Sequence, residues 1–233
     1  MVSFYYKDEL IEFEIIYRNR KTLSIKIDID GNIKVISPEK LSENNILNIV
    51  EKKASWIINK RKIMLNRKKV IPKNNYLNGE FYLYMGEKYT LKVVTTPKDT
   101  VLINHENKVI EISTSSKDKI RNMLEKFYRE ETFKIVKERV CYYQKYFENT
   151  PKEIRVKQQK RRWGSCTFDN KLLFNWRLSM MPKDILDYVI VHEMCHMVYK
   201  NHSKDFWNDV FRVMPNYKEK SLWLRENGIK IDL

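Results

Sequence analysis

Residues 192–202 read His-Glu-Met-Cys-His-Met-Val-Tyr-Lys-Asn-His and contain three of the four histidines in the chain. On a helix, His192 and His196 lie about one turn apart on the same face, so both imidazoles can reach one metal ion. Glu193 borders that face without being forced to bind the ion, which is where a general base for a metal-activated water would lie. The spacing therefore predicts a catalytic metal centre more strongly than histidines that pack in a core or cap a helix.

A third ligand is expected at His202. A catalytic Zn²⁺ usually has three protein ligands and leaves one position open, so the motif predicts a single zinc ion. The spacing from His196 to His202 matches the metzincin pattern H-E-x-x-H-x-x-G-x-x-H, but Tyr199 occupies the glycine position. The chain is therefore expected to turn through Lys200 and Asn201, with Asn201 in the left-handed conformation. The alternative third ligands are Glu219 and Glu226.

The sequence around the motif predicts mostly helices with a short sheet. The apolar run from Val189 to Val191 makes the motif helix hydrophobic on most sides, which is typical of a buried central helix. Residues 117–147 lack Gly and Pro and carry apolar residues at helical spacing, so they predict a long amphipathic helix. Strands are expected at 154–159 and 172–178, and further helices at 182–200, 203–215 and 218–226.

Short strands dominate the first half of the chain. Residues 23–36 alternate between apolar and polar around Asp30-Gly31-Asn32, which predicts a β-hairpin. Ser42 can cap a helix that runs to about Met64, and a polar connector is expected at 66–78. Further strands are expected at 81–85, 89–94, 101–103 and 109–112.

The chain has 233 residues, which is enough for two domains. We expect an α+β fold in which a strand-rich N-terminal region with one helix, residues 1–114, precedes a second domain, residues 115–233. No internal repeat is evident in the sequence.

Composition narrows the class of protein. The chain has 45 Lys and Arg against 30 Asp and Glu, a net charge of +15, which makes nucleic acid a candidate partner.

No apolar run reaches the roughly 18 residues that would cross a membrane, and no signal peptide is evident, so we expect no membrane association and a cytoplasmic location. The three widely spaced cysteines fit free thiols in a reducing compartment. Candidate nucleic-acid contacts are Lys157, Lys160, Arg161 and Arg162.

Several segments carry motifs beyond the metal centre itself. They are Lys21-Thr22-Leu23-Ser24-Ile25, Tyr84-Met85-Gly86-Glu87, Arg162-Trp163-Gly164-Ser165-Cys166, Asn175-Trp176-Arg177-Leu178, Tyr188 to His196, and Asn201 to Trp207. Together they resemble the YgjP-like metal-dependent hydrolases, which are regarded as zincin-type metallopeptidases and are related at the active-site helix to SprT-like proteases. The resemblance implies a minimal zincin-like domain in the second half, with His192, His196 and His202 as zinc ligands and Glu193 as the catalytic base.

The motif and the resemblance predict a zinc metallopeptidase. Zinc would lower the pKa of a bound water and polarise the substrate carbonyl, while Glu193 would take the proton and pass it to the leaving amine. An extended peptide substrate could add to a sheet edge along Lys171–Leu178, just before the motif helix. Candidates for stabilising the transition state or for supporting the site by hydrogen bonds are Tyr199, Asn175, Arg177 and Tyr217.

Two other functions fit the sequence. One is a DNA-associated, SprT-like protease that acts on DNA-bound proteins, which the basic residues would allow. The other is a non-catalytic protein in which zinc stabilises the fold and the first half binds nucleic acid or a partner. Glu193 argues against the second, because a purely structural zinc site needs no adjacent base. Neither Cys195, expected in the core, nor Cys166, expected in a turn or core, is a candidate nucleophile.

Overall fold

The computed structural model describes residues 1–70, 74–159 and 162–233. The chain forms two compact units, Met1–Ile71 and Pro72–Leu233, which we call unit 1 and unit 2. Each unit has a hydrophobic core of its own.

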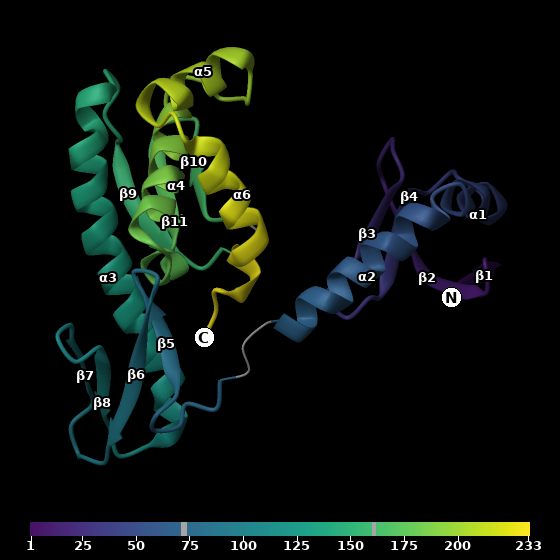
Figure 1. The fold of residues 1–233 in the computed structure, drawn as a ribbon. Coiled ribbons are helices and arrows are strands. Elements are labelled where there is room, and N and C mark those ends of the chain that lie inside the picture. The colour runs from purple at the N-terminus through teal and green to yellow at the C-terminus, as the bar shows by residue number, and fades with distance from the viewer. Residues whose placement is uncertain (71–73, 160–161) are drawn as a thin grey trace. The chain divides into compact units, whose positions relative to one another are not determined.

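Unit 1 consists of a four-stranded sheet and two helices (Figure 1). Its elements are β1 (Val2–Tyr6), β2 (Glu9–Arg18), β3 (Ser24–Ile27), β4 (Ile33–Pro38), α1 (Glu43–Glu51) and α2 (Ala54–Val70). The sheet order is β1-β2-β4-β3, with β2 and β4 parallel and the outer pairs antiparallel. Because side chains alternate between the two faces, one face of this sheet buries Ile11, Phe13, Ile33 and Val35. The hairpin predicted at 23–36 is present as β3 and β4.

The helix predicted between Ser42 and Met64 is two helices. α1 and α2 are separated at Lys52 and Lys53, and α2 continues beyond Met64 to Val70. Apolar residues of α1 and of α2 pack in the same core. The spacing of apolar residues along the sequence therefore does not reveal the break between the two helices. Ser42 precedes α1, but its side chain makes no capping hydrogen bond.

Unit 2 begins with a sheet of the same topology. Its strands are β5 (Phe81–Tyr84), β6 (Glu87–Val94), β7 (Thr100–Asn104) and β8 (Val109–Ser113), in the order β5-β6-β8-β7. Again the two central strands are parallel and the outer pairs are antiparallel. In both sheets the first hairpin turns on two residues with positive φ, Lys7 and Asp8 (46° and 63°) in unit 1 and Met85 and Gly86 (51° and 82°) in unit 2. The topology is therefore repeated, although the sequence has no evident repeat.

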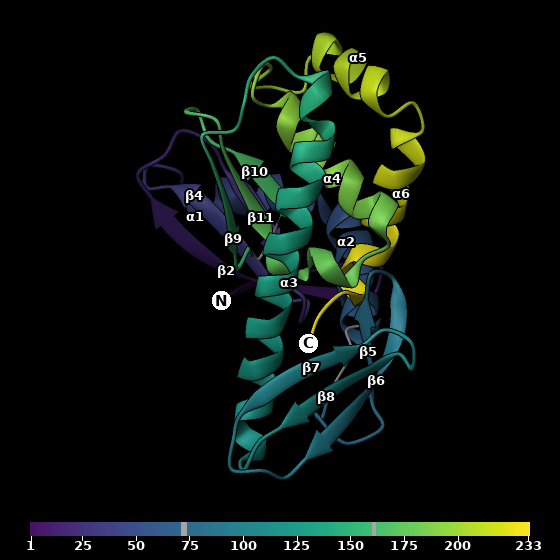
Figure 2. The same cartoon turned by 90° about the vertical axis from the view of Figure 1, so that its left-hand side faces the viewer.

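The rest of unit 2 is a long helix, a short sheet and three further helices (Figure 2). The elements are α3 (Ile120–Tyr143), β9 (Glu153–Lys157), β10 (Gly164–Cys166), β11 (Lys171–Asn175), the 3₁₀ helix η3 (Trp176–Met180), α4 (Lys183–Cys195), α5 (Lys204–Val213), α6 (Tyr217–Asn227) and the 3₁₀ helix η4 (Gly228–Lys230). The short sheet has the order β10-β11-β9, with β11 parallel to β9 and antiparallel to β10. α3 packs against β7, β9, η3 and α4, so it joins both sheets of the unit to the motif helix.

One continuous core explains why the division falls at residue 71. Leu91 and Ile110 of the β5–β8 sheet share their core with Leu124 and Tyr128 of α3, and the Tyr128 hydroxyl donates to the Leu83 carbonyl at 2.8 Å. The sequence-based boundary between residues 114 and 115 separates this sheet from the helices, whereas the structure groups them. The structural boundary lies instead within the connector expected at 66–78.

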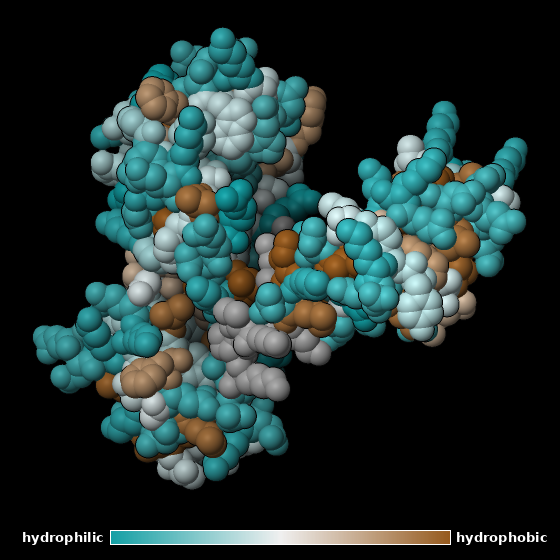
Figure 3. All heavy atoms as spheres, turned by 45° about the vertical axis from the view of Figure 1, so that its right-hand side comes forward, coloured by the Kyte–Doolittle hydropathy of each residue, from teal (hydrophilic) through white to brown (hydrophobic). Residues whose placement is uncertain are grey.

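The predicted α+β class is confirmed. A strand-rich N-terminal part is followed by a long helix, a short sheet, the motif helix and C-terminal helices, in the predicted order. Hydrophilic side chains, with scattered hydrophobic ones, cover most of the face seen in Figure 3. Among the helices that the structure describes, none has the length and apolar character needed to cross a bilayer.

Candidate metal centre

The motif helix is α4, which begins after Pro182 and ends at Cys195. Leu186, Ile190 and Met194 are fully buried, as expected for a central helix. The helix is shorter than the predicted range of 182–200, because a tight turn follows His196, which is its C-terminal capping residue.

Three imidazoles come together at the end of α4. The potential ligand atoms of His192, His196 and His202 all lie within 4.8 Å of one another. The Nε2 atoms of His192 and His202 are 3.1 Å apart. Two nitrogens bound at about 2.0–2.1 Å to one tetrahedral zinc ion would lie about 3.3 Å apart, so the arrangement fits a shared divalent ion.

The environment of His192 and His196 favours their neutral form, which is the form that binds metals. Burial, together with the neighbouring His196 and His202, lowers the pKa of His192 to about 3. Burial also lowers the pKa of His196, whose Nδ1 lies 2.8 Å from the Tyr199 carbonyl oxygen. If the Nδ1–H donates to that carbonyl, the Nε2 lone pair of His196 is free to face the other two rings.

The turn that carries His202 differs from the predicted one. Tyr199 N–H donates to the Cys195 carbonyl at 3.0 Å, which closes a turn directly after the end of α4. Asn201 does not adopt the left-handed conformation, contrary to expectation. Lys200 instead ties this turn to the β10–β11 hairpin, because its ammonium group donates to Asn170 Oδ1 at 2.6 Å and to the Thr167 carbonyl at 3.3 Å.

Aromatic side chains of α5 hold the rings from one side. Ser203 caps α5 by accepting a hydrogen bond from the Phe206 N–H at 3.3 Å, which places Phe206 against the centre. The Phe206 ring stacks on His196 with centroids 4.5 Å apart, and Trp207 stacks on His202 at 5.5 Å. The sequence pattern alone does not indicate this role, although both residues belong to the segment Asn201 to Trp207.

Strand β10 holds the carboxylate of Glu193. That side chain is buried, and the Cys166 backbone N–H donates to it. A Cβ atom on Gly164 would lie only 2.6 Å from Glu193 Cγ, so the glycine makes room for the carboxylate to pack on the strand. Burial raises the pKa of Glu193 to about 8, and the positive charge of Arg162 opposes that rise.

A pocket of about 410 Å³ opens onto the centre. Glu193 and the three histidines line it, together with side chains from the β10 segment and from α4 and α6. The sheet edge beside it is β10, because β11 lies in the middle of the three-stranded sheet. The expectation that Lys171–Leu178 forms the edge is therefore wrong: residues 164–166 are too few to have been recognised as a strand from their sequence pattern.

None of the candidates for transition-state stabilisation lines this pocket. The Asn175 side-chain amide donates to the carbonyls of Gln159 and Arg162 at 2.8 and 3.1 Å, and Arg177 pairs with Asp232 at 2.6 Å. Tyr217 stacks on Trp207 at 5.2 Å, and Tyr199 contributes its carbonyl to His196. The alternative metal ligands Glu219 and Glu226 do not belong to the histidine cluster.

Arg162 and Cys166 both line the pocket, whereas Lys157 and Cys195 do not. Lys157 is exposed on β9, Arg162 lines the pocket, and Lys160 and Arg161 lie outside the described residues. Cys195 is buried in the core as expected, whereas Cys166 lines the pocket.

Of the comparisons with known proteins, the match to a family model bears on this centre. Residues 21–227 match the model of the YgjP-like family, described as a metallopeptidase domain. A similar solved structure is the crystal structure of the metallopeptidase zymogen of Pyrococcus abyssi abylysin, with 16% sequence identity, a TM-score of 0.37, and coverage of 42% of this chain and 99% of that chain. No curated protein matches the sequence. Since the family match spans most of the chain, the protein belongs to the YgjP-like family of metallopeptidase domains, whose members are metal-dependent hydrolases of peptide bonds.

Proposed function

We propose that the protein is a zinc-dependent peptidase whose ion is held by His192, His196 and His202. The observation that carries the proposal is the convergence of three imidazoles beside a buried carboxylate. Three nitrogen ligands with a fourth position open to a pocket are typical of catalytic zinc, whereas structural zinc sites are closed by four protein ligands. The bound ion would supply Lewis-acid chemistry, by polarising the scissile carbonyl and making a water molecule more acidic.

Glu193 is the proposed general base. Its carboxylate accepts the proton of the attacking water and then returns it to the amine that leaves. The Cys166 N–H and the space above Gly164 fix the carboxylate on β10, so the base is oriented before substrate binds. A positioned acid or base of this kind contributes about 10²–10⁴-fold to the rate.

The edge strand β10 is the proposed binding strand for substrate. Its residues line the pocket, and β11 leaves one side of it unpaired in the sheet. An extended peptide that adds to this edge would place a backbone carbonyl beside the histidines through main-chain hydrogen bonds.

The test compares metal content with peptide cleavage. We expect His192→Ala and His196→Ala to lose zinc, as measured by elemental analysis, and to lose cleavage of a peptide library. Glu193→Gln should retain zinc and lose cleavage by about 10²–10⁴-fold. His105→Ala is the matched control, since His105 is the one histidine outside the cluster and contacts the Tyr89 hydroxyl at 3.0 Å. Full zinc content in either ligand variant, or full activity in Glu193→Gln, would contradict the proposal.

A further inference from the structure

We propose that Arg162 binds a carboxylate of the substrate, so that the pocket prefers peptides with a carboxylate close to the scissile bond. This inference rests on the proposed peptidase function and specifies the substrate class. It concerns a side chain that the sequence suggested as a nucleic-acid contact and that the structure places on the pocket wall.

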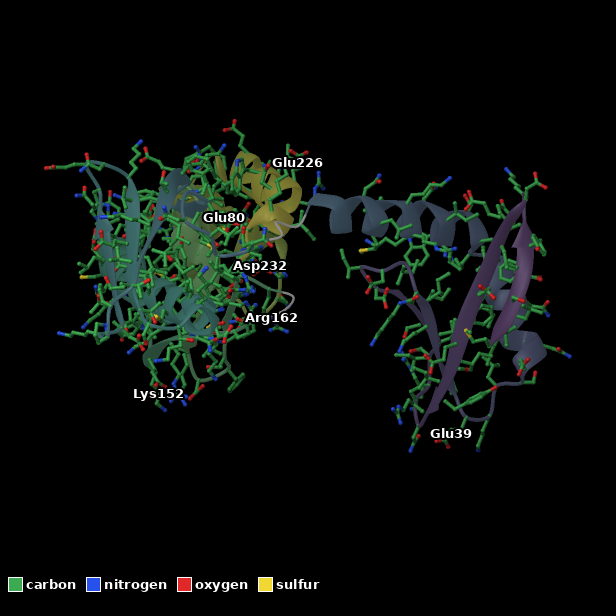
Figure 4. All side chains as sticks on the ribbon, turned by 90° about the horizontal axis from the view of Figure 1, so that it is seen from below. Glu39, Glu80, Lys152, Arg162, Glu226 and Asp232 are labelled. Carbon is green, nitrogen blue, oxygen red and sulfur yellow. The ribbon has the colours of Figure 1, made fainter. Side chains whose placement is uncertain are left out.

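The guanidinium of Arg162 is free to bind a ligand. Among the residues that the structure describes, no acidic side chain forms an ion pair with it, whereas Arg177 nearby in the sequence is paired with Asp232. Figure 4 shows Arg162 at the surface of unit 2, and the residue is exposed. An unpaired guanidinium beside a pocket is suited to a carboxylate, because its planar donors match both oxygens of that group.

The backbone of Arg162 is anchored although its side chain is free. Its carbonyl accepts a hydrogen bond from the Asn175 side-chain amide at 3.1 Å, and the next carbonyl, of Trp163, accepts one from the Asn175 N–H at 2.8 Å. The Trp163 ring packs on Gly228 of η4, where an added Cβ would lie 3.1 Å from it. The backbone that carries Arg162 is therefore held at a defined place beside the pocket.

The charges around the pocket favour an anionic group at this place. Two cationic side chains line the pocket, Arg162 and Lys200, and Glu193 is the one carboxylate among its described lining residues. The ammonium of Lys200 is engaged by Asn170 and by the Thr167 carbonyl, so Arg162 is the cation left to meet substrate. Glu193 lies within electrostatic range of Arg162 but packs on β10, with a hydrogen bond from the Cys166 N–H.

A carboxylate near the scissile bond has two sources in a peptide. One is an Asp or Glu side chain, and the other is the α-carboxylate at the C-terminus. Both present the same two oxygens to Arg162, and matched peptides separate them. Each acidic peptide is compared with its Asn or Gln counterpart, and each free C-terminal acid is compared with its amide.

The test measures kcat/KM for these peptide pairs with the zinc-loaded full chain. We expect the carboxylate peptide to be cleaved about tenfold faster than its neutral partner, in keeping with a hydrogen bond to a charged group. Arg162→Gln should bring the rate for the acidic peptide down to that of the neutral one. Lys157→Gln is the matched control, because it changes the net charge by the same amount on an exposed strand residue that does not line the pocket.

A binding measurement separates the two proposals. Binding of the same peptides to zinc-loaded Glu193→Gln protein is followed by tryptophan fluorescence, with and without Arg162→Gln. Cleavage without a carboxylate preference, or a preference that survives Arg162→Gln, would overturn this inference and leave the peptidase function standing. An Arg162-dependent preference in binding without any cleavage by the wild type would overturn the peptidase function alone. If the protein shows no binding preference and no cleavage, both proposals are overturned.

Discussion

The two units contain sheets of identical topology that pack against different kinds of segment. In unit 1 the sheet packs on the helices that follow it directly, and its first turn, Lys7-Asp8, is exposed. In unit 2 the matching turn is fastened to the segment before the motif helix: Met85 N–H donates to the Ser179 carbonyl at 2.7 Å and Gly86 N–H to the Met180 carbonyl at 3.1 Å. The same strand order thus forms a self-contained unit in one case and a support for the metal centre in the other.

The largest difference between the units should come from the metal. With zinc at about 1,000 times its Kd, binding would stabilise the folded state by about 4 kcal/mol, and only unit 2 carries the histidine cluster. We expect a chelator to lower the unfolding temperature of unit 2 and to leave the unfolding of unit 1 unchanged. Calorimetry with and without chelator measures both. Equal shifts of the two transitions would contradict the assignment of the ion to unit 2.

The pH dependence of the stabilisation by zinc tests whether the ion binds beside Glu193. Burial raises the pKa of Glu193 from 4.5 to about 8 in the metal-free fold. At Glu193 the folded chelated protein therefore keeps a proton that the unfolded chain releases, so the contribution of this carboxyl group to stability falls as the pH rises from about 4.5 to 8. A bound cation favours the ionised carboxylate and opposes this loss. The stabilisation by zinc should accordingly grow across that range, whereas a constant difference would argue that the ion binds away from Glu193.

The next effect concerns the contact between β10 and the motif helix. In Gly164→Ala the new methyl group would lie 2.6 Å from Glu193 Cγ, so the carboxylate must move away from the Cys166 N–H. We expect kcat to fall by about 10- to 100-fold with little change in KM, because the base is displaced while the rest of the pocket remains. Ser165→Ala is the control on the same strand. Zinc content measured alongside distinguishes a misplaced base from a lost ion, and an unchanged kcat would contradict the positioning role of Gly164.

Local patterns were sufficient to predict part of this molecule. The hairpin at 23–36, the long helix at 117–147 and the motif helix all follow from periodicity within one element. The proximity of His202 to the motif also followed from sequence distance, since only five residues separate it from His196.

What could not be predicted depends on contacts between distant segments. Tertiary packing sets the parallel pairing of β2 with β4 and of β6 with β8. The strands of the two sheets have dissimilar sequences, so their shared topology could not be predicted from the sequence. β10 has only three residues, Gly-Ser-Cys, without strand character of their own. Arg162 lies at the pocket because it directly precedes β10, whose position depends on tertiary contacts. The sequence alone shows Arg162 only as part of a basic run, which suggests a nucleic-acid contact.

The last prediction tests why the matching turns carry different residues. Gly86 and Asp8 both have positive φ, at 82° and 63°, but a Cβ on Gly86 would lie 2.8 Å from Pro182 Cγ and 2.9 Å from its Cα. Gly86→Ala should therefore combine backbone strain of about 1–2 kcal/mol with overlap worth about 1–3 kcal/mol.

Gly79 isolates the strain from the overlap. It has a similar φ of 88° in the same unit, with nothing within 4 Å of an added Cβ, so Gly79→Ala should cost the strain alone. Urea unfolding of both variants gives the difference, which we expect to be about 1–3 kcal/mol and to affect unit 2 only. Equal costs would mean that Pro182 moves aside freely, and that the turn does not fix the start of α4. A glycine is needed at residue 86 because the turn is a docking point, whereas the exposed turn of unit 1 tolerates Asp8 at the same backbone conformation.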